Sequence, residues 1–225
     1  ISFPANHYGL SLILGGAEGK LWDIAGIYAS MARTLNNFTK HNGKYNKKDF
    51  HPPQYLQSDK KLQPDISPTA IYDAASIYLT FDAMVEVSRP DEDISWRQFS
   101  SSSKVAWKTG TSFGFRDGWA VGVTPQYVVA VWVGNADGEG RPELVGVKTA
   151  APIMFDIFNV LKPSGWFSKP FDEMRKEIIC KESGYRASEI CVNTDSAWIQ
   201  LSGENTQPCP YHQIVHLDKE GKYRV

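Results

Sequence analysis

The stretch Lys108-Thr109-Gly110-Thr111-Ser112 ends a strand-like run and carries the most informative pattern in the chain. Gly110 has no side chain, so a second peptide backbone can lie against the strand there and pair with it. Thr109 and Thr111 are two positions apart, which in a strand puts both hydroxyls on one face, the expected substrate face. Lys108 would project from the other side and curl round the strand edge on its four-carbon stem. Taken alone, the stretch also fits a surface strand with a polar end.

Three sequential strands are predicted around this stretch. The first covers Lys104–Ser112, and the β-branched and aromatic runs Gly118–Val123 and Tyr127–Val133 follow it. Thr124-Pro125-Gln126 separates the last two runs, which is a hairpin signal. We expect the three strands to pair antiparallel in sequence order, with the first of them beside a cleft.

Helices are predicted before and after the strands in the sequence. Ser11–Ala32 reads as helices broken near Gly15-Gly16, and Ser67 is expected to cap a helix over Pro68–Val87. Thr149–Leu161 reads as an amphipathic helix closing over the sheet. Its buried face is expected to carry Ile153, Ile157 and Val160.

Composition limits the class of protein. The 225 residues are 42% hydrophobic, which is enough to form a hydrophobic core. The net charge is −1, so no electrostatic signal favours binding to nucleic acid or to an anionic membrane. We expect one domain over residues 1–165 and a small module over residues 166–225, in an α+β fold of antiparallel sheet packed with helices. No apolar run reaches the roughly 20 residues of a membrane span, so any anchor is expected outside the chain.

Several blocks in order carry a resemblance to a known family: Tyr8–Glu18, Leu21–Ala29, Trp107–Val121 and Val131–Asn135. They resemble the C-terminal portion of the transpeptidase domain of class A, bifunctional penicillin-binding proteins, of the 1C group. The Lys-Thr-Gly triplet matches one of three signatures of serine acyl-transferases that react with penicillin. The resemblance implies a partial penicillin-binding, serine-transpeptidase fold.

The resemblance also implies roles for individual residues in peptidoglycan D,D-transpeptidation. Lys108 would be an electrostatic and proton-network partner of the catalytic serine, and the N–H of Thr111 would donate to the oxyanion. Thr109 and Thr111 would hold the terminal carboxylate of the substrate. Gly110 would admit the substrate backbone, and Phe113 would lie near the substrate. No cofactor for catalysis is implied.

The serine nucleophile itself is expected outside this chain. The sequence contains no Ser-x-Asn, and its Ser101-Ser102-Ser103-Lys104 match to Ser-x-x-Lys lies in a polar run that predicts a solvated loop rather than a helix. The expected partners are peptidoglycan stem peptides, β-lactams and the remaining transpeptidase and N-terminal glycosyltransferase sequence of the same protein. The expected location is the periplasmic side of the bacterial inner membrane, with an N-terminal anchor. The alternative is a non-catalytic binding or docking module that retains the triplet.

Three cysteines and a histidine lie in the C-terminal module. Cys180, Cys191, Cys209 and His212 match the ligand count of a Cys₃His zinc site. An exported protein is instead expected to pair cysteines, which here would leave one over. Free buried cysteines are the third reading. Zinc is preferred because it gives all three thiols and His212 a role in stapling a tail too short and polar to build its own core.

Overall fold

The computed structural model describes residues 3–14, 16–56, 63–87, 104–162 and 165–224. These residues form two compact units, Ile1–Lys169 and Pro170–Val225, and each is described by itself. The boundary predicted after residue 165 falls within the first unit. The predicted loop at Ser101-Ser102-Ser103 lies outside the described residues.

A three-stranded antiparallel sheet lies at the centre of the first unit. Its strands are β3 (Ala106–Thr111), β4 (Asp117–Val123) and β5 (Val128–Gly134), in the order β3-β4-β5. Thr124 closes the second hairpin, because its N–H donates to the carbonyl of Tyr127 at 2.9 Å. The predicted strands and their sequential pairing are confirmed, and β4 lies between the other two. The α+β fold class is likewise confirmed.

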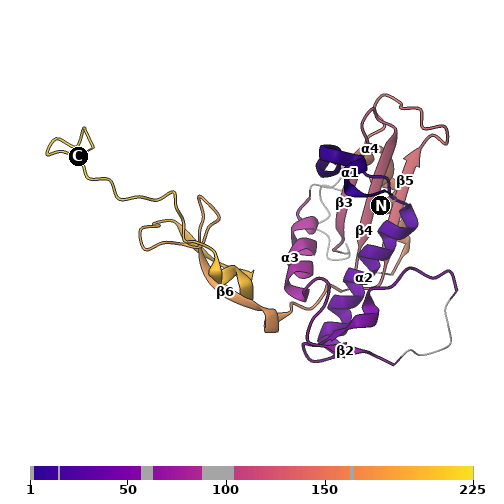
Figure 1. The fold of residues 1–225 in the computed structure, drawn as a ribbon, viewed down its shortest axis with the longest axis horizontal. Coiled ribbons are helices and arrows are strands. Elements are labelled where there is room, and N and C mark those ends of the chain that lie inside the picture. The colour runs from indigo at the N-terminus through magenta and orange to yellow at the C-terminus, as the bar shows by residue number, and fades with distance from the viewer. Residues whose placement is uncertain (1–2, 15, 57–62, 88–103, 163–164, 225) are drawn as a thin grey trace. The chain divides into compact units, whose positions relative to one another are not determined.

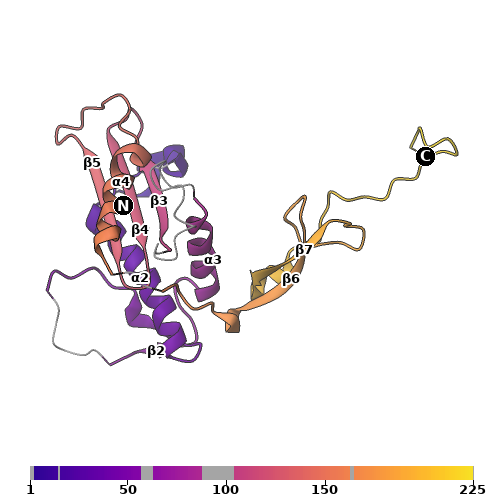
Figure 2. The ribbon, with the colours of Figure 1, turned by 180° about the vertical axis from the view of Figure 1, so that it is seen from behind.

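Helix α4 (Gly146–Val160) covers one face of this sheet, as Figure 2 shows. It follows Glu143, which has a positive φ of 66°. The core between helix and sheet combines aromatic rings with small side chains: Val105, Trp107, Ala120, Val129, Val131, Ala150, Ala151, Met154, Phe155 and Phe158. Gly122 makes room for this packing, because a Cβ there would lie 2.5 Å from Phe158 Cε2.

The predicted buried face of this helix is wrong. Ile153, Ile157 and Val160 are 46%, 40% and 86% exposed, whereas Met154 and Phe158 are buried. The helix is apolar on more than one face, so i, i+4 spacing fits both sets of positions. The sheet determines which set is buried. Gly122 has no side chain, and the space above it is filled by the side chains of Met154 and Phe158.

Met154→Ala should lower the free energy of unfolding of the first unit by about 2–5 kcal/mol, because it leaves a cavity in a fully buried site. Ile153→Ala on the half-exposed side of the same helix is the matched control, with an expected loss below about 1 kcal/mol. Urea denaturation of both variants measures the difference. Equal losses would contradict the packing described here.

Two further helices contact the sheet, α2 (Leu21–Lys40) against β4 and β5 and α3 (Ala74–Val85) against β3. In Figure 1 α2 lies in front of the sheet, on the side away from α4. Before α2 the chain forms α1 (Ala5–Tyr8) and the 3₁₀ helix η1 (Gly9–Leu14). The predicted interruption is confirmed by the break between Leu14 and Leu21, although Gly15 itself lies outside the described residues, and the helix after the break runs beyond the predicted end at Ala32.

The predicted start of α3 is wrong. Ser67 belongs to the short strand β2 (Ile66–Ser67), which pairs with β1 (Tyr45–Asn46), and a 3₁₀ turn η2 (Lys47–Asp49) follows β1. Asp73 caps the helix instead, because its Oδ1 accepts a hydrogen bond from the N–H of Ser76 at 2.7 Å. An Asp side chain serves this role as well as Ser does, so strand pairing decided between two sequence-compatible caps.

The second unit is built on the antiparallel hairpin of β6 (Met174–Cys180) and β7 (Thr194–Gln200). The 3₁₀ turns η5 (Phe171–Glu173) and η6 (Leu201–Asn205) flank it. Phe171 packs edge-on against Trp198, with ring centroids 4.9 Å apart. Among the described residues of both units, no helix has the length and apolar character to cross a membrane.

Candidate functional site

Strand β3 carries the Lys-Thr-Gly triplet at one edge of the sheet. β4 is its only strand partner among the described residues, with Thr109 opposite Ala120 and Gly110 opposite Trp119. The other edge of β3 has no strand partner among the described residues, and peptides can bind to an edge of this kind as an added strand. A Cβ at Gly110 would make only ordinary contacts with Trp119, the nearest at 3.5 Å, so the fold of this chain does not itself require glycine there.

Lys108 is exposed, and its Nζ donates a hydrogen bond to the carbonyl oxygen of Thr109 at 2.7 Å. The side chain therefore folds back along its own strand. The ammonium can leave this carbonyl for another acceptor, because it carries three N–H donors on a flexible four-carbon stem.

The two threonines continue the alternation of buried Trp107, so they lie on the side of the sheet that α4 packs against rather than on a fully open substrate face, although Thr111 is exposed at the end of β3. Thr109 is half-buried, and Thr111 Oγ1 accepts a hydrogen bond from the N–H of Gly146 at 3.1 Å. Gly146 starts α4 and lies so close that a Cβ there would come within 2.4 Å of the Gly110 carbonyl oxygen. The start of α4 thus fixes both the backbone and the hydroxyl at the end of β3.

Phe113 lies at the tip of the turn that joins β3 to β4 and is 99% exposed. Gly114 and Phe115 both have positive φ, 76° and 55°, and the N–H of Phe115 donates to the carbonyl of Ser112 at 3.2 Å. The turn is held further by Arg141, whose N–H donates to the carbonyl of Phe115 at 3.0 Å. A rigid turn thus presents one large apolar ring next to the triplet strand.

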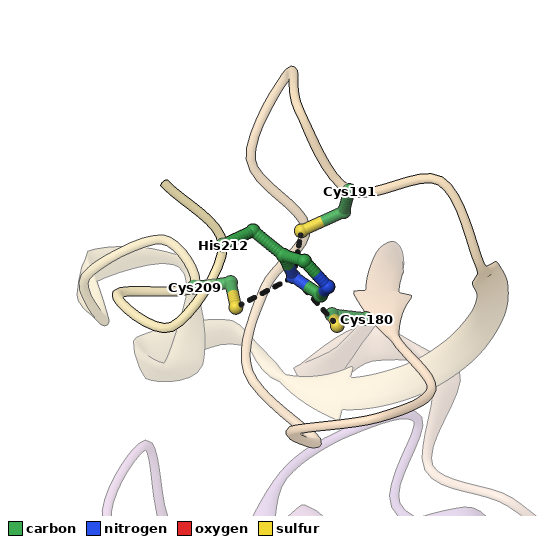
Figure 3. Close-up of side chains that lie close together, drawn as sticks. All are labelled: Cys180, Cys191, Cys209 and His212. Carbon is green, nitrogen blue, oxygen red and sulfur yellow. Dashed lines mark hydrogen bonds between the residues drawn. The ribbon is translucent and has the colours of Figure 1, made fainter. Parts of the chain in front are cut away.

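The four candidate metal ligands of the second unit come together. The ligand atoms of Cys180, Cys191, Cys209 and His212 all lie within 4.8 Å of one another, and the three cysteines are free thiols. Figure 3 shows the three sulfur atoms arranged around the imidazole ring. His212 Nδ1 lies 3.5 Å from Cys180 Sγ, 3.3 Å from Cys191 Sγ and 3.4 Å from Cys209 Sγ.

Local turns bring these residues together from distant parts of the unit. Cys180 ends β6, and Gly184, with a φ of 73°, closes a turn in which its N–H donates to the Cys180 carbonyl at 2.8 Å. The N–H of Cys209 donates to the carbonyl of Arg186 at 2.8 Å, which holds the segment that carries Cys209 and His212 against the loop that follows β6. His212 follows within the same turn.

Polar neighbours stabilise the thiolate forms of the cluster. A hydrogen bond from Ser183 Oγ to Cys209 Sγ, at 3.2 Å, is the largest influence that lowers the pKa of Cys209 to about 6. Ser183 is also the main cause that lowers the pKa of Cys180. Contacts with Cys209, then with Glu182, raise the pKa of His212. The lowered pKa values favour the thiolate over the thiol at Cys180 and Cys209, and the thiolate is the form in which sulfur binds a metal.

Glu182 was not foreseen as a member of this site. Its Oε2 lies 2.9 Å from His212 Nε2, the ring nitrogen that faces away from the thiols. A glutamate in a polar turn carries no pattern that distinguishes it from ordinary surface residues. Only the fold shows that it is aimed at the imidazole.

Comparison with known proteins gives the same family as the sequence blocks. No family model matches the chain. Penicillin-binding protein 1C of Escherichia coli K12 is 32% identical over 154 residues, which cover 68% of this chain and 17% of that protein. Penicillin-binding protein 1A of Clostridium perfringens ATCC 13124 is 28% identical over 130 residues, or 51% of this chain and 15% of that protein. Penicillin-binding protein 1A of Clostridium botulinum Langeland is 28% identical over 134 residues, or 58% and 16%.

The chain thus spans less than a fifth of the length of the curated relatives it matches. The matches come from two bacterial genera and from both the 1A and 1C groups. The chain is therefore a homologue of the class A penicillin-binding proteins.

Proposed function

We propose that the first unit supplies the Lys-Thr-Gly strand of a peptidoglycan D,D-transpeptidase, and that the nucleophilic serine lies in sequence outside this chain. The observation that carries the proposal is the placement of Lys108 and Gly110 on a strand with one edge that no described strand pairs with, in a chain homologous to penicillin-binding proteins. The relatives' names say that they bind penicillin, which supports the same chemistry.

The reaction is acyl transfer. The serine oxygen attacks the carbonyl carbon between two D-alanines of a stem peptide, the carbon–nitrogen bond breaks, and the terminal D-alanine leaves with a proton on its nitrogen. An amino group of a neighbouring stem peptide then attacks the carbonyl carbon of the acyl-enzyme. The new amide bond is the cross-link, and the serine is released. A β-lactam acylates the same serine through its strained amide.

Each residue of the triplet strand β3 has a different role in this reaction. The Lys108 ammonium leaves the Thr109 carbonyl and turns toward the serine oxygen. There its positive charge stabilises the negative charge that develops in the transition state. The N–H of Thr111 donates to the oxyanion, and the hydroxyls of Thr109 and Thr111 bind the terminal carboxylate. The hydrogen bond from Gly146 supports this role of Thr111, because it occupies one lone pair and leaves the hydroxyl proton free to donate.

Two further contacts with substrate follow from the edge and the turn. The stem peptide adds as a strand along the open edge at Gly110, and the exposed ring of Phe113 packs against its apolar groups. In this proposal the protein works on the periplasmic side of the inner membrane, beside a glycosyltransferase domain of the same polypeptide.

Fluorescent penicillin tests the proposal. The full-length protein should be labelled covalently, and peptide mapping should find the label on a serine that precedes Ile1. The 225-residue chain alone should stay unlabelled, although it contains Ser-x-x-Lys at Ser101–Lys104 and also at Ser58–Lys61, whose serines both lie outside the described residues. A full-length protein that folds but takes no label would instead favour the docking module.

A further inference from the structure

We infer that Cys180, Cys191, Cys209 and His212 hold one structural zinc ion in the second unit, and that Glu182 orients the imidazole from behind. All of its members belong to Pro170–Val225, so the inference does not rest on the acyl-transfer chemistry proposed for the first unit.

The spacing around His212 is that of a ligand shell. Zinc bonds of about 2.3 Å to sulfur and about 2.0 Å to nitrogen, at tetrahedral angles, put sulfur and nitrogen about 3.5 Å apart. Nδ1 lies 3.3 to 3.5 Å from the three sulfurs. One ring nitrogen has a single proton or a single lone pair, so it cannot make three hydrogen bonds to three sulfurs. A central cation accounts for all three distances together.

The donor set selects zinc and a structural role. Three thiolates and an imidazole are soft and borderline ligands, which suit zinc in tetrahedral geometry. All four positions are filled by protein atoms, so no place remains for water or substrate, as expected of a structural rather than a catalytic site. A disulfide would use two thiols and leave the third thiol and His212 without a role.

The surroundings of the four ligands match what a zinc–thiolate centre needs. With the metal on Nδ1, the proton of His212 stays on Nε2 and is donated to Glu182 Oε2 at 2.9 Å, the carboxylate–histidine–metal arrangement that fixes the ring. The excess negative charge of three thiolates around a divalent ion is met by donors. Ser183 Oγ lies 3.2 Å from Cys209 Sγ, and the N–H of Ser188 lies 3.3 Å from Cys191 Sγ.

Metal content and coordination of the unmodified 225-residue chain give the first test. The chain purified without chelator should hold one zinc per molecule, and X-ray absorption at the zinc edge should fit three sulfurs at about 2.3 Å and one nitrogen at about 2.0 Å. A chain that binds no added zinc, that holds another metal in its place, or whose thiols form a disulfide on purification in air would overturn the assignment.

The role of Glu182 gives a second test that does not remove a ligand. Glu182→Gln should lower the affinity for zinc by about 10–100-fold, measured by competition with a chromogenic chelator, because the imidazole loses its charged acceptor. Glu189→Gln is the matched control, since this exposed glutamate lies in the same loop, whereas the carboxylate bonded to His212 in the described structure is that of Glu182. Its affinity should stay within about twofold of the unmodified chain. Equal affinities of the two variants would remove Glu182 from the site.

Discussion

Replacing Lys108 by alanine in the full-length protein is expected to slow acylation by penicillin by about 100–1,000-fold. Removing one preorganised group that faces the developing oxyanion commonly costs about 3 kcal/mol of transition-state stabilisation. Because the Lys108 side chain is exposed and donates to the Thr109 carbonyl of its own strand in the described structure, its loss should leave the stability of the first unit unchanged within about 0.5 kcal/mol. Stopped-flow measurement of fluorescent penicillin labelling gives the rate, and urea denaturation gives the stability.

Lys104→Ala is the matched control for loss of a positive charge near this strand. Lys104 is exposed just before β3, where its Nζ lies 5.8 Å from the centre of the Trp166 ring. We expect its acylation rate to stay within about threefold of the unmodified protein. An unchanged rate for a well-folded Lys108→Ala protein, or equal losses in both variants, would withdraw the catalytic role proposed for Lys108.

The strands were predictable because their signals are local. β4 and β5 are apolar runs of β-branched and aromatic residues, and Thr124-Pro125-Gln126 between them leaves little choice but a turn. The face of α4 was not predictable, because both Ile153 and Met154 are apolar and only the gap at Gly122 decides which of them is buried. The sequence pattern specifies that an apolar helix packs there, and the partner surface specifies its rotation.

The candidate sites divide in the same way. The three thiol ligands could be named from residue type, since the chain has three cysteines, and His212 could be named from its position three residues after Cys209. The contact between Glu182 and His212, and the choice of Nδ1 over Nε2 toward the thiols, depend on turns that no spacing rule describes. The approach of Gly146 to Thr111 is likewise a contact between segments far apart in sequence, and it gives the triplet strand a support that the triplet itself does not reveal.

Stripping zinc from the 225-residue chain is expected to unfold Pro170–Val225 and to leave Ile1–Lys169 folded. A two-stranded hairpin is at best marginally stable in water, and beyond their own pairing β6 and β7 add only an isolated bridge from Ile179 to Arg186 among the described residues. Several large apolar side chains of this unit stay exposed, with Ile178 at 58% and Val192 at 95%, so little apolar burial replaces the metal. In small metal-bound domains the binding free energy of the metal is folding free energy.

Hydrogen exchange resolves the two units in one experiment. After treatment with a strong chelator, amides of β6 and β7 should exchange at least about a hundredfold faster, while those of β4 should not change. Cys180→Ser in the presence of zinc should give the same pattern, because it removes a ligand at the end of β6. Ser196→Ala, an exposed substitution on β7, is the control and should leave exchange as in the unmodified chain. If β6 and β7 remain protected without metal, the hairpin is held by its own packing, and zinc is then not the element that folds this module.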